Sequence, residues 1–179
     1  MFSNGDSVRG DISMNTEVLI HQSLSVQSSD KPVEKIFLHD VSAIKIGSNT
    51  YELRHIAKGW PGHNLYFMRR LTTPDSKIHL YEHRERTLNH RSDSRDGYNL
   101  KYYAQFDNEP RYSVWPLSGH RFQPRFDRKV SQLLKKCPAL AAKIMNKEEG
   151  YFYSAVNATE AERLKILLQI IKYYNQCLN

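Results

Sequence analysis

The chain has 179 residues, of which 40% are hydrophobic, and it carries a formal net charge of +7 with a pI near 9.4. This composition excludes an intrinsically disordered chain. No apolar run approaches the ~20 residues that a membrane span needs, so no transmembrane helix is predicted. The positive charge admits nucleic acid, anionic surfaces or acidic glycans as partners without requiring any of them.

Residues 1–120 have the pattern of an antiparallel sheet, because short apolar runs alternate there with turn residues. The predicted strands lie near residues 8–12, 18–20, 24–26, 43–46, 50–56, 65–68, 78–81, 100–104 and 112–115. Gly47 and Asn49 supply the positive φ of a tight hairpin, and residues 73–76 have turn chemistry. The polar, charged residues 84–97 predict an exposed, mobile loop. Short strands with local turns predict a curved sheet or a small β-barrel.

The pattern of residues 121–179 predicts three helices that pack on this sheet. The whole chain is therefore predicted to be one α+β domain. The first helix has a single apolar stripe from Phe126 to Cys137. Pro138 ends it and can serve as the first residue of the second helix. The third helix begins with a capping box formed by Thr159 and Glu162. We expect its burial on most sides, between the sheet and the other helices, with a core stripe of Leu164, Leu167, Leu168, Ile171 and Tyr174.

The only cysteines, Cys137 and Cys177, lie at the predicted ends of the first and last helices. Their positions leave open whether they form a disulfide, which would indicate an oxidising compartment, or remain two buried thiols. The chain contains no Cys-x-x-Cys motif. A redox or zinc motif is therefore not supported.

The C-terminal tail resembles that of a group of uncharacterised exported proteins of Bacteroidetes-type bacteria. Residues 137–144 read Cys-Pro-Ala-Leu-Ala-Ala-Lys-Ile and residues 174–177 read Tyr-Asn-Gln-Cys. These match the group's "Cys-Pro-x-Leu-Ala-x-x-Ile" element and its final "Tyr-Asn-x-Cys". Residues 5–12, Gly-Asp-Ser-Val-Arg-Gly-Asp-Ile, are similar to the group's opening strand, "Gly-Asp-x-x-x-Gly-x-Ile".

The resemblance implies an exported protein of unknown function, without assigned catalytic residues, in which Cys137 and Cys177 form a disulfide. Residues 1–6 contain neither a basic region nor an apolar stretch. We therefore expect that a leader is missing from the sequence and that the protein is periplasmic, envelope-associated or secreted. A cytoplasmic location is the alternative.

Basic residues gather in segments 84–95 and 121–136. The candidates for anion binding are Arg84, Arg86, Arg91, Arg125, Arg128 and Lys129. Aromatic residues near them could stack on bases, as in proteins that bind single strands; these are Tyr102, Tyr103, Tyr112 and Trp115. The alternative is a solvated helix face, with the aromatic side chains packed in the interior.

His79 and His83 lie on one face of a predicted strand. They could contribute to a metal site or, with His120, to a hydrolase site. The alternative is an exposed polar strand face opposite the core residues Ile78 and Leu80. The chain has no nucleophile elbow and no glycine-rich phosphate loop. We therefore expect no cofactor and favour a non-enzymatic role.

The sequence thus predicts an exported or envelope-associated protein that binds envelope or surface components or acts as a structural accessory. A nucleic-acid-binding module that uses the basic helix and loop is the alternative. A hydrolase with a histidine-containing site is the third hypothesis.

Overall fold

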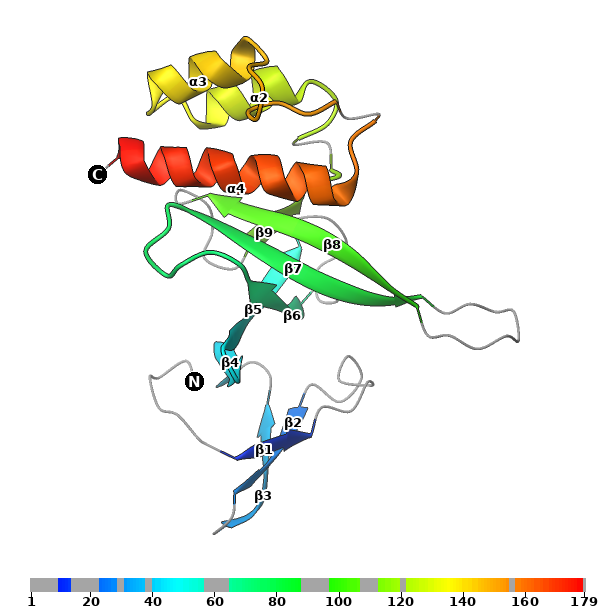
Figure 1. Ribbon diagram of the computed structural model, residues 1–179. Helices are drawn as coiled ribbons and strands as arrows, with labels where there is room; N and C mark the ends of the chain where they lie inside the picture. The colour runs from blue at the N-terminus through cyan, green and yellow to red at the C-terminus, as the bar shows by residue number, and fades with distance from the viewer. Residues whose placement is uncertain are drawn as a thin grey trace.

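The computed structural model describes residues 10–13, 23–28, 31–37, 40–56, 65–87, 97–106, 113–119, 122–154 and 157–178. In this part of the chain, a small antiparallel sheet is followed by a β-barrel and then by helices (Figure 1). The predicted α+β fold with a small barrel and a helical C-terminal part is confirmed.

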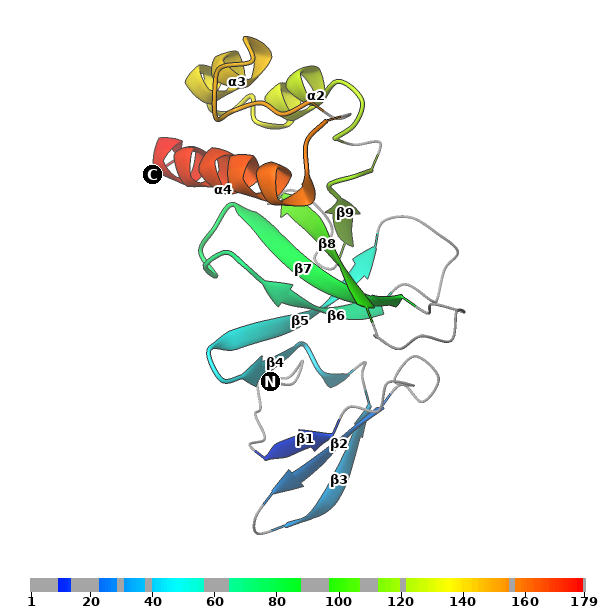
Figure 2. The same ribbon diagram turned by 45° about the vertical axis from the view of Figure 1, so that its right-hand side comes forward.

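Five strands close the barrel: β5 (Asn49–Ile56), β6 (Leu65–Arg70), β7 (Ile78–Thr87), β8 (Gly97–Phe106) and β9 (Ser113–Pro116). Consecutive strands pair antiparallel, whereas β5 and β9 pair in parallel. Because direction reverses at each step of a five-strand meander, the first and last strands run the same way. The closing pair must therefore be parallel. Figure 2 shows the barrel below the helices.

The predicted hairpin between residues 43 and 56 is confirmed. β4 (Ala43–Ile46) pairs antiparallel with the first half of β5, and Ile46 is opposite Asn49. Gly47 lies in the turn with a φ of 58°, a conformation that glycine adopts without a steric cost. The second half of β5 is left free to pair with β9, whereas β6 pairs along the other edge of β5, from Tyr51 to His55.

The prediction of a loop over residues 84–97 is wrong at both of its ends. β7 continues to Thr87 and β8 begins at Gly97, and these two residues pair across the hairpin. A polar sequence indicates side chains in contact with solvent. It does not prevent the backbone hydrogen bonds of two paired strands from continuing beyond the core. Residues 88–96 lie outside the described part of the chain.

A three-stranded antiparallel sheet precedes the barrel and consists of β1 (Asp11–Ser13), β2 (Ser23–Ser28) and β3 (Lys31–Phe37). Val26 and Ile36 from this sheet pack in a small cluster with Val41 and Ile44. The polar residues of β3 concealed this strand in the sequence. The predicted strand at 18–20 and residues 8–9 of the first one lie outside the described part.

In the part of the chain that the structure describes, the helices are α2 (Phe126–Leu133), α3 (Pro138–Met145) and α4 (Glu160–Cys177). Pro138 lies in the first turn of α3, and Thr159 and Glu162 form the complete capping box of α4, as predicted. α2 ends earlier than its apolar stripe suggested, and Cys137 directly precedes α3.

α4 lies between the barrel and the layer formed by α2 and α3 (Figures 1 and 2). This position agrees with the prediction. Leu168, however, is 39% exposed and does not belong to the core as predicted. Neighbours on two opposite sides of a helix leave its lateral surface open to solvent, so not every apolar residue of a wide stripe is covered.

One hydrophobic core joins the barrel to the helices. The outer face of β7 and β8 contributes Ile78, Leu80, Tyr102, Ala104 and Phe106 to it, and residues of all three helices complete it. The next residue of β7, Tyr81, points the opposite way and packs inside the barrel with Met68, Tyr103 and Val114. β7 is therefore buried on both faces: Leu80 and Tyr81 are each 0% exposed.

Candidate functional site

Cys137 and Cys177 form a disulfide, with Sγ atoms 2.13 Å apart and Cα atoms 6.1 Å apart. The pairing implied by the resemblance is therefore present in the structure. Cys137 is 0% exposed in the main core, whereas Cys177 is an exposed residue at the end of α4. The bond ties the start of α3 to the C-terminal end of α4.

Asn175 fastens the same end of α4 to the barrel. Its Oδ1 atom accepts a hydrogen bond from the backbone N–H of Lys77 at 3.0 Å, and its Nδ2 atom donates to Ser76 Oγ at 3.1 Å. Ser76 is buried, and its hydroxyl donates in turn to the Ile78 carbonyl at 2.6 Å. Asn175 and Cys177 thus hold the last turn of α4 to the barrel on one side and to the other helices on the other side.

A buried polar network, which the sequence did not reveal, lies on the inner side of the barrel. Glu52 accepts hydrogen bonds from the guanidinium groups of Arg54 and Arg70. The Tyr81 hydroxyl lies 3.0 Å from Glu52 Oε2 and 3.4 Å from Gln105 Oε1. Burial raises the pKa of Tyr81 far above its ordinary value of 10.0, because the phenolate would be poorly solvated there.

This network is arranged for stability. Three donors surround the Glu52 carboxylate, and the Arg54 guanidinium lies 4.8 Å from the centroid of the Tyr81 ring. Burying an ion pair costs free energy unless the charged groups are hydrogen-bonded, and this requirement is met for the carboxylate. Only strand register, which places β5, β6 and β7 side by side, brings these residues together.

The alternative interpretation of His79 and His83, an exposed polar strand face, needs correction, because both residues are half-buried. They share a face with Tyr81, which is 0% exposed, because barrel closure turns this face inward. His79 Nδ1 lies 3.5 Å from Thr72 Oγ1. The His83 ring packs against the Tyr66 ring, with centroids 4.8 Å apart.

The histidines are therefore placed in packing contacts. Among the residues that the structure describes, no group of three or more His, Cys, Asp or Glu side chains could hold a metal ion. His120, the third residue of the hydrolase hypothesis, lies outside the described part.

The predicted anion-binding residues fall in two separate places. Arg84 is an exposed residue of β7, with its Nε atom 3.9 Å from Glu82 Oε1. Arg86 lies farther along the same strand, opposite Tyr98, and Arg91 is outside the described residues. The end of the β7–β8 hairpin projects away from α2 in both views (Figures 1 and 2). Arg84 on the hairpin and the arginines at the start of α2 therefore lie in separate parts of the structure.

The aromatic residues predicted as a stacking surface are largely packed in the interior. Tyr102 is 9% and Tyr103 4% exposed, and Trp115 packs against the main core. Tyr112 lies outside the described residues. The described tyrosines are therefore covered by neighbouring elements and do not offer an open face to bases.

At the start of α2, Arg125 and Arg128 line a cavity of about 340 Å³, which we call the basic pocket. Lys147, which follows α3, lines it as well and was not among the predicted residues. The rest of the lining comes from Phe126, Asp127, Phe152, Tyr153 and Ser154. The predicted candidate Lys129 is directed elsewhere, since its Nζ atom donates to the Gln123 carbonyl at 3.2 Å.

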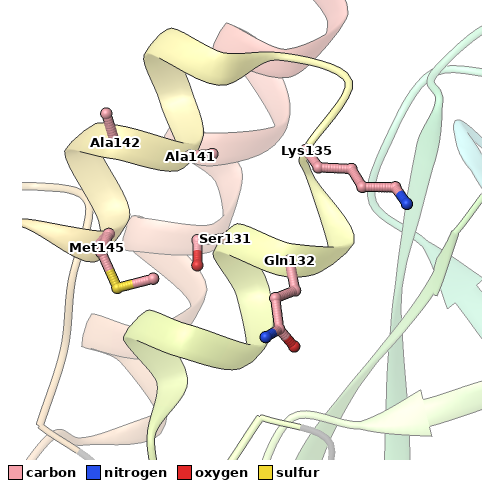
Figure 3. Close-up of a pocket in the computed structure, with 6 residues that line it drawn as sticks. All are labelled: Ser131, Gln132, Lys135, Ala141, Ala142 and Met145. Carbon is pink, nitrogen blue, oxygen red and sulfur yellow. The ribbon is translucent and has the colours of Figure 1, made fainter.

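A groove of about 620 Å³ lies between α2 and α3 (Figure 3). Its walls include Ala141, Ala142 and Met145 of α3, with Ser131, Gln132 and Lys135 on the side of α2. Met145 is 45% exposed. Small side chains at two consecutive positions of α3 leave this space open.

No helix in the described part of the chain is long and apolar enough to span a membrane, in agreement with the sequence. Comparison with known proteins found no matching family model, no matching curated protein and no matching solved structure.

Proposed function

We propose that this chain is a non-enzymatic protein of an oxidising, extracytoplasmic compartment, where it binds envelope or surface components or serves as a structural accessory. The observation that carries the proposal is the Cys137–Cys177 disulfide. Disulfides persist in secreted and periplasmic proteins and are rare in the reducing cytosol. A periplasmic, envelope or secreted location accounts for a bond that helps to fasten the last helix.

The roles of the tail residues support the resemblance to exported proteins. Pro138 starts α3, and Leu140 and Ile144 are both 0% exposed in the main core. Asn175 and Cys177 hold the end of α4 in place. The residues of the motif are thus the ones that assemble the helical layer on the barrel, which is the use expected of a structural signature.

The buried acidic residues support a non-enzymatic role. Glu52 is surrounded by donors inside the barrel, and Glu82 accepts a hydrogen bond from Arg69 at 3.1 Å. A general acid or base needs access to a substrate proton. These carboxylates are instead engaged by arginine and tyrosine side chains of the barrel.

The two other hypotheses are weaker. A single-strand binder needs accessible aromatic faces beside its basic groups, whereas Tyr102 and Tyr103 are buried. A hydrolase site at His79 and His83 would have to work from the inner face of a barrel that also encloses Tyr81. Neither arrangement accounts for the disulfide.

The proposal is tested by measuring the redox state of the two cysteines in the producing cell. Whole cells are quenched in acid, and the denatured protein is alkylated with and without prior reduction before its intact mass is measured. We expect both cysteines to be alkylated only after reduction, and we expect the protein in the extracytoplasmic fraction. The Cys177→Ser variant is the matched control, because its remaining thiol must be alkylated without reduction. Free thiols in the native chain, or recovery in the cytosol, would refute the proposal.

A further inference from the structure

We propose that the basic pocket binds the phosphate group of a small phosphorylated organic ligand. This inference deepens the proposed function, because it names a ligand class for the binding role. It rests on the charge, the position and the walls of the pocket.

Positive charge dominates the pocket, in which Arg125, Arg128 and Lys147 face a single carboxylate, that of Asp127. Lys147 Nζ lies 3.8 Å from Asp127 Oδ2, which makes this a loose pair. Within the described part of the chain, neither arginine forms an ion pair. Two guanidinium groups beside one cavity suit a phosphate, because the planar fork of arginine donates two parallel hydrogen bonds to such oxygens.

The backbone brings these charges together from distant segments. Arg125 immediately precedes α2 and has a φ of 66°, and Lys147, two residues after α3, has a φ of 57°. Left-handed conformations are uncommon for residues other than glycine. α2 also begins without a side-chain cap, and its first-turn residues line the pocket. An anion bound there would meet the positive end of the helix as well as the arginines.

The other walls favour an organic phosphate over the bare ion. The volume of about 340 Å³ lies in the lower part of the range for small-molecule sites, roughly 300–1,000 Å³. Phe126 is 1% exposed and offers almost no surface to a ligand. The accessible apolar surface comes from the half-buried Phe152, whose ring centroid lies 6.3 Å from that of Phe126. The Lys147 ammonium is 5.3 Å from the Phe152 ring centroid. The Phe152 ring beside this cation can accept the sugar or carbon part of a ligand.

Calorimetric titration of the oxidised full chain at low ionic strength tests the inference with three probes: glucose 6-phosphate, inorganic phosphate and glucose. We expect saturable binding of glucose 6-phosphate, weaker binding of inorganic phosphate and none of glucose. Binding should weaken as salt is added, because the site is partly exposed. If glucose 6-phosphate does not bind, or if glucose binds as tightly, the inference is overturned.

Variants locate the site. Arg128→Gln and Lys147→Gln should each weaken glucose 6-phosphate binding, the arginine change by about tenfold or more. Lys136→Gln is the matched control, because it removes the same charge from an exposed residue outside the pocket, and it should leave the affinity unchanged. Equal weakening by all three changes would show that only net charge matters and would refute the site. The melting temperature of each variant shows that it is folded.

A single-stranded oligonucleotide provides a fourth probe. If it binds more tightly than glucose 6-phosphate, and if Arg84→Gln weakens its binding as much as Arg128→Gln does, both basic segments serve nucleic acid and the small-ligand inference is wrong. The thiol measurement is independent of these titrations. Paired cysteines without binding of glucose 6-phosphate would overturn only this inference. Free thiols with binding of glucose 6-phosphate would overturn only the proposed extracytoplasmic location.

Discussion

Removal of the disulfide gives the sharpest test of how this chain is held together. In Cys177→Ser, an exposed residue at the end of α4 changes by one atom, while Cys137 stays in the core as a thiol. A buried thiol behaves as a small apolar side chain, so packing around Cys137 should change little. The substitution therefore isolates the effect of the cross-link.

The expected magnitude follows from the length of chain that the bond closes. The two cysteines are 40 residues apart, and the loop-entropy relation then gives a stabilisation of about 4 kcal/mol at 25 °C. In a chain of this size, 1 kcal/mol corresponds to roughly 2–4 °C in melting temperature. We therefore expect Cys177→Ser to lower the melting temperature by about 8–16 °C in oxidising buffer.

Urea and thermal unfolding of the two proteins, each with and without reductant, form the assay. Reductant should bring the native chain down to the stability of Cys177→Ser and should leave the variant unchanged. A difference no larger than about 0.5 kcal/mol, the range of ordinary surface substitutions, would refute the reasoning. It would mean that the core holds the end of α4 without the cross-link.

Three further predictions concern the barrel, the core and the helix cap. Glu52→Ala should cost about 3 kcal/mol in urea unfolding, because two guanidinium groups that are only 12% and 18% exposed would lose their carboxylate; a loss below about 1 kcal/mol would contradict a stabilising network. Leu80→Ala should cost about 2–5 kcal/mol, whereas Leu168→Ala, at a residue that is 39% exposed, should cost less than about 1 kcal/mol; equal losses would contradict the observed burial. The backbone N–H and then the hydroxyl of Thr159 hold the pKa of Glu162 below its ordinary 4.5. The advantage of the native chain over Glu162→Gln should therefore be complete above pH 4.5 and vanish as the pH falls through the lower pKa of the folded state; unfolding across an acid series would show a constant difference if this is wrong.

The basic pocket could be predicted only in part. Arg125 and Arg128 were found as basic residues near the start of a helix, and both line the pocket. Lys147 was missed because it is 19 residues beyond Arg128 in the chain and becomes a neighbour only when α3 folds back on α2. Lys129, next to Arg128, was included because charge alone does not show which way a side chain is directed.

Local features of the fold followed from the sequence by itself. The turn at Gly47, the start of α3 at Pro138 and the capping box at Thr159 each depend on residues within a few positions of one another. Glycine's freedom at positive φ, proline's missing N–H and the reach of a threonine hydroxyl act in any sequence context. The disulfide was anticipated through the resemblance of the tail, since position along the chain left its pairing open.

Only the tertiary structure decided which face of β7 is inside and which residues meet there. Alternation reveals a buried face when the opposite face is solvated, but α4 covers Leu80 while the closed barrel encloses Tyr81. His79 and His83 are therefore half-buried, although the sequence pattern suggested an exposed face. Closure itself depends on the pairing of β5 with β9, which are far apart in the chain. Such contacts form only once the intervening strands are in place, and no local pattern encodes them.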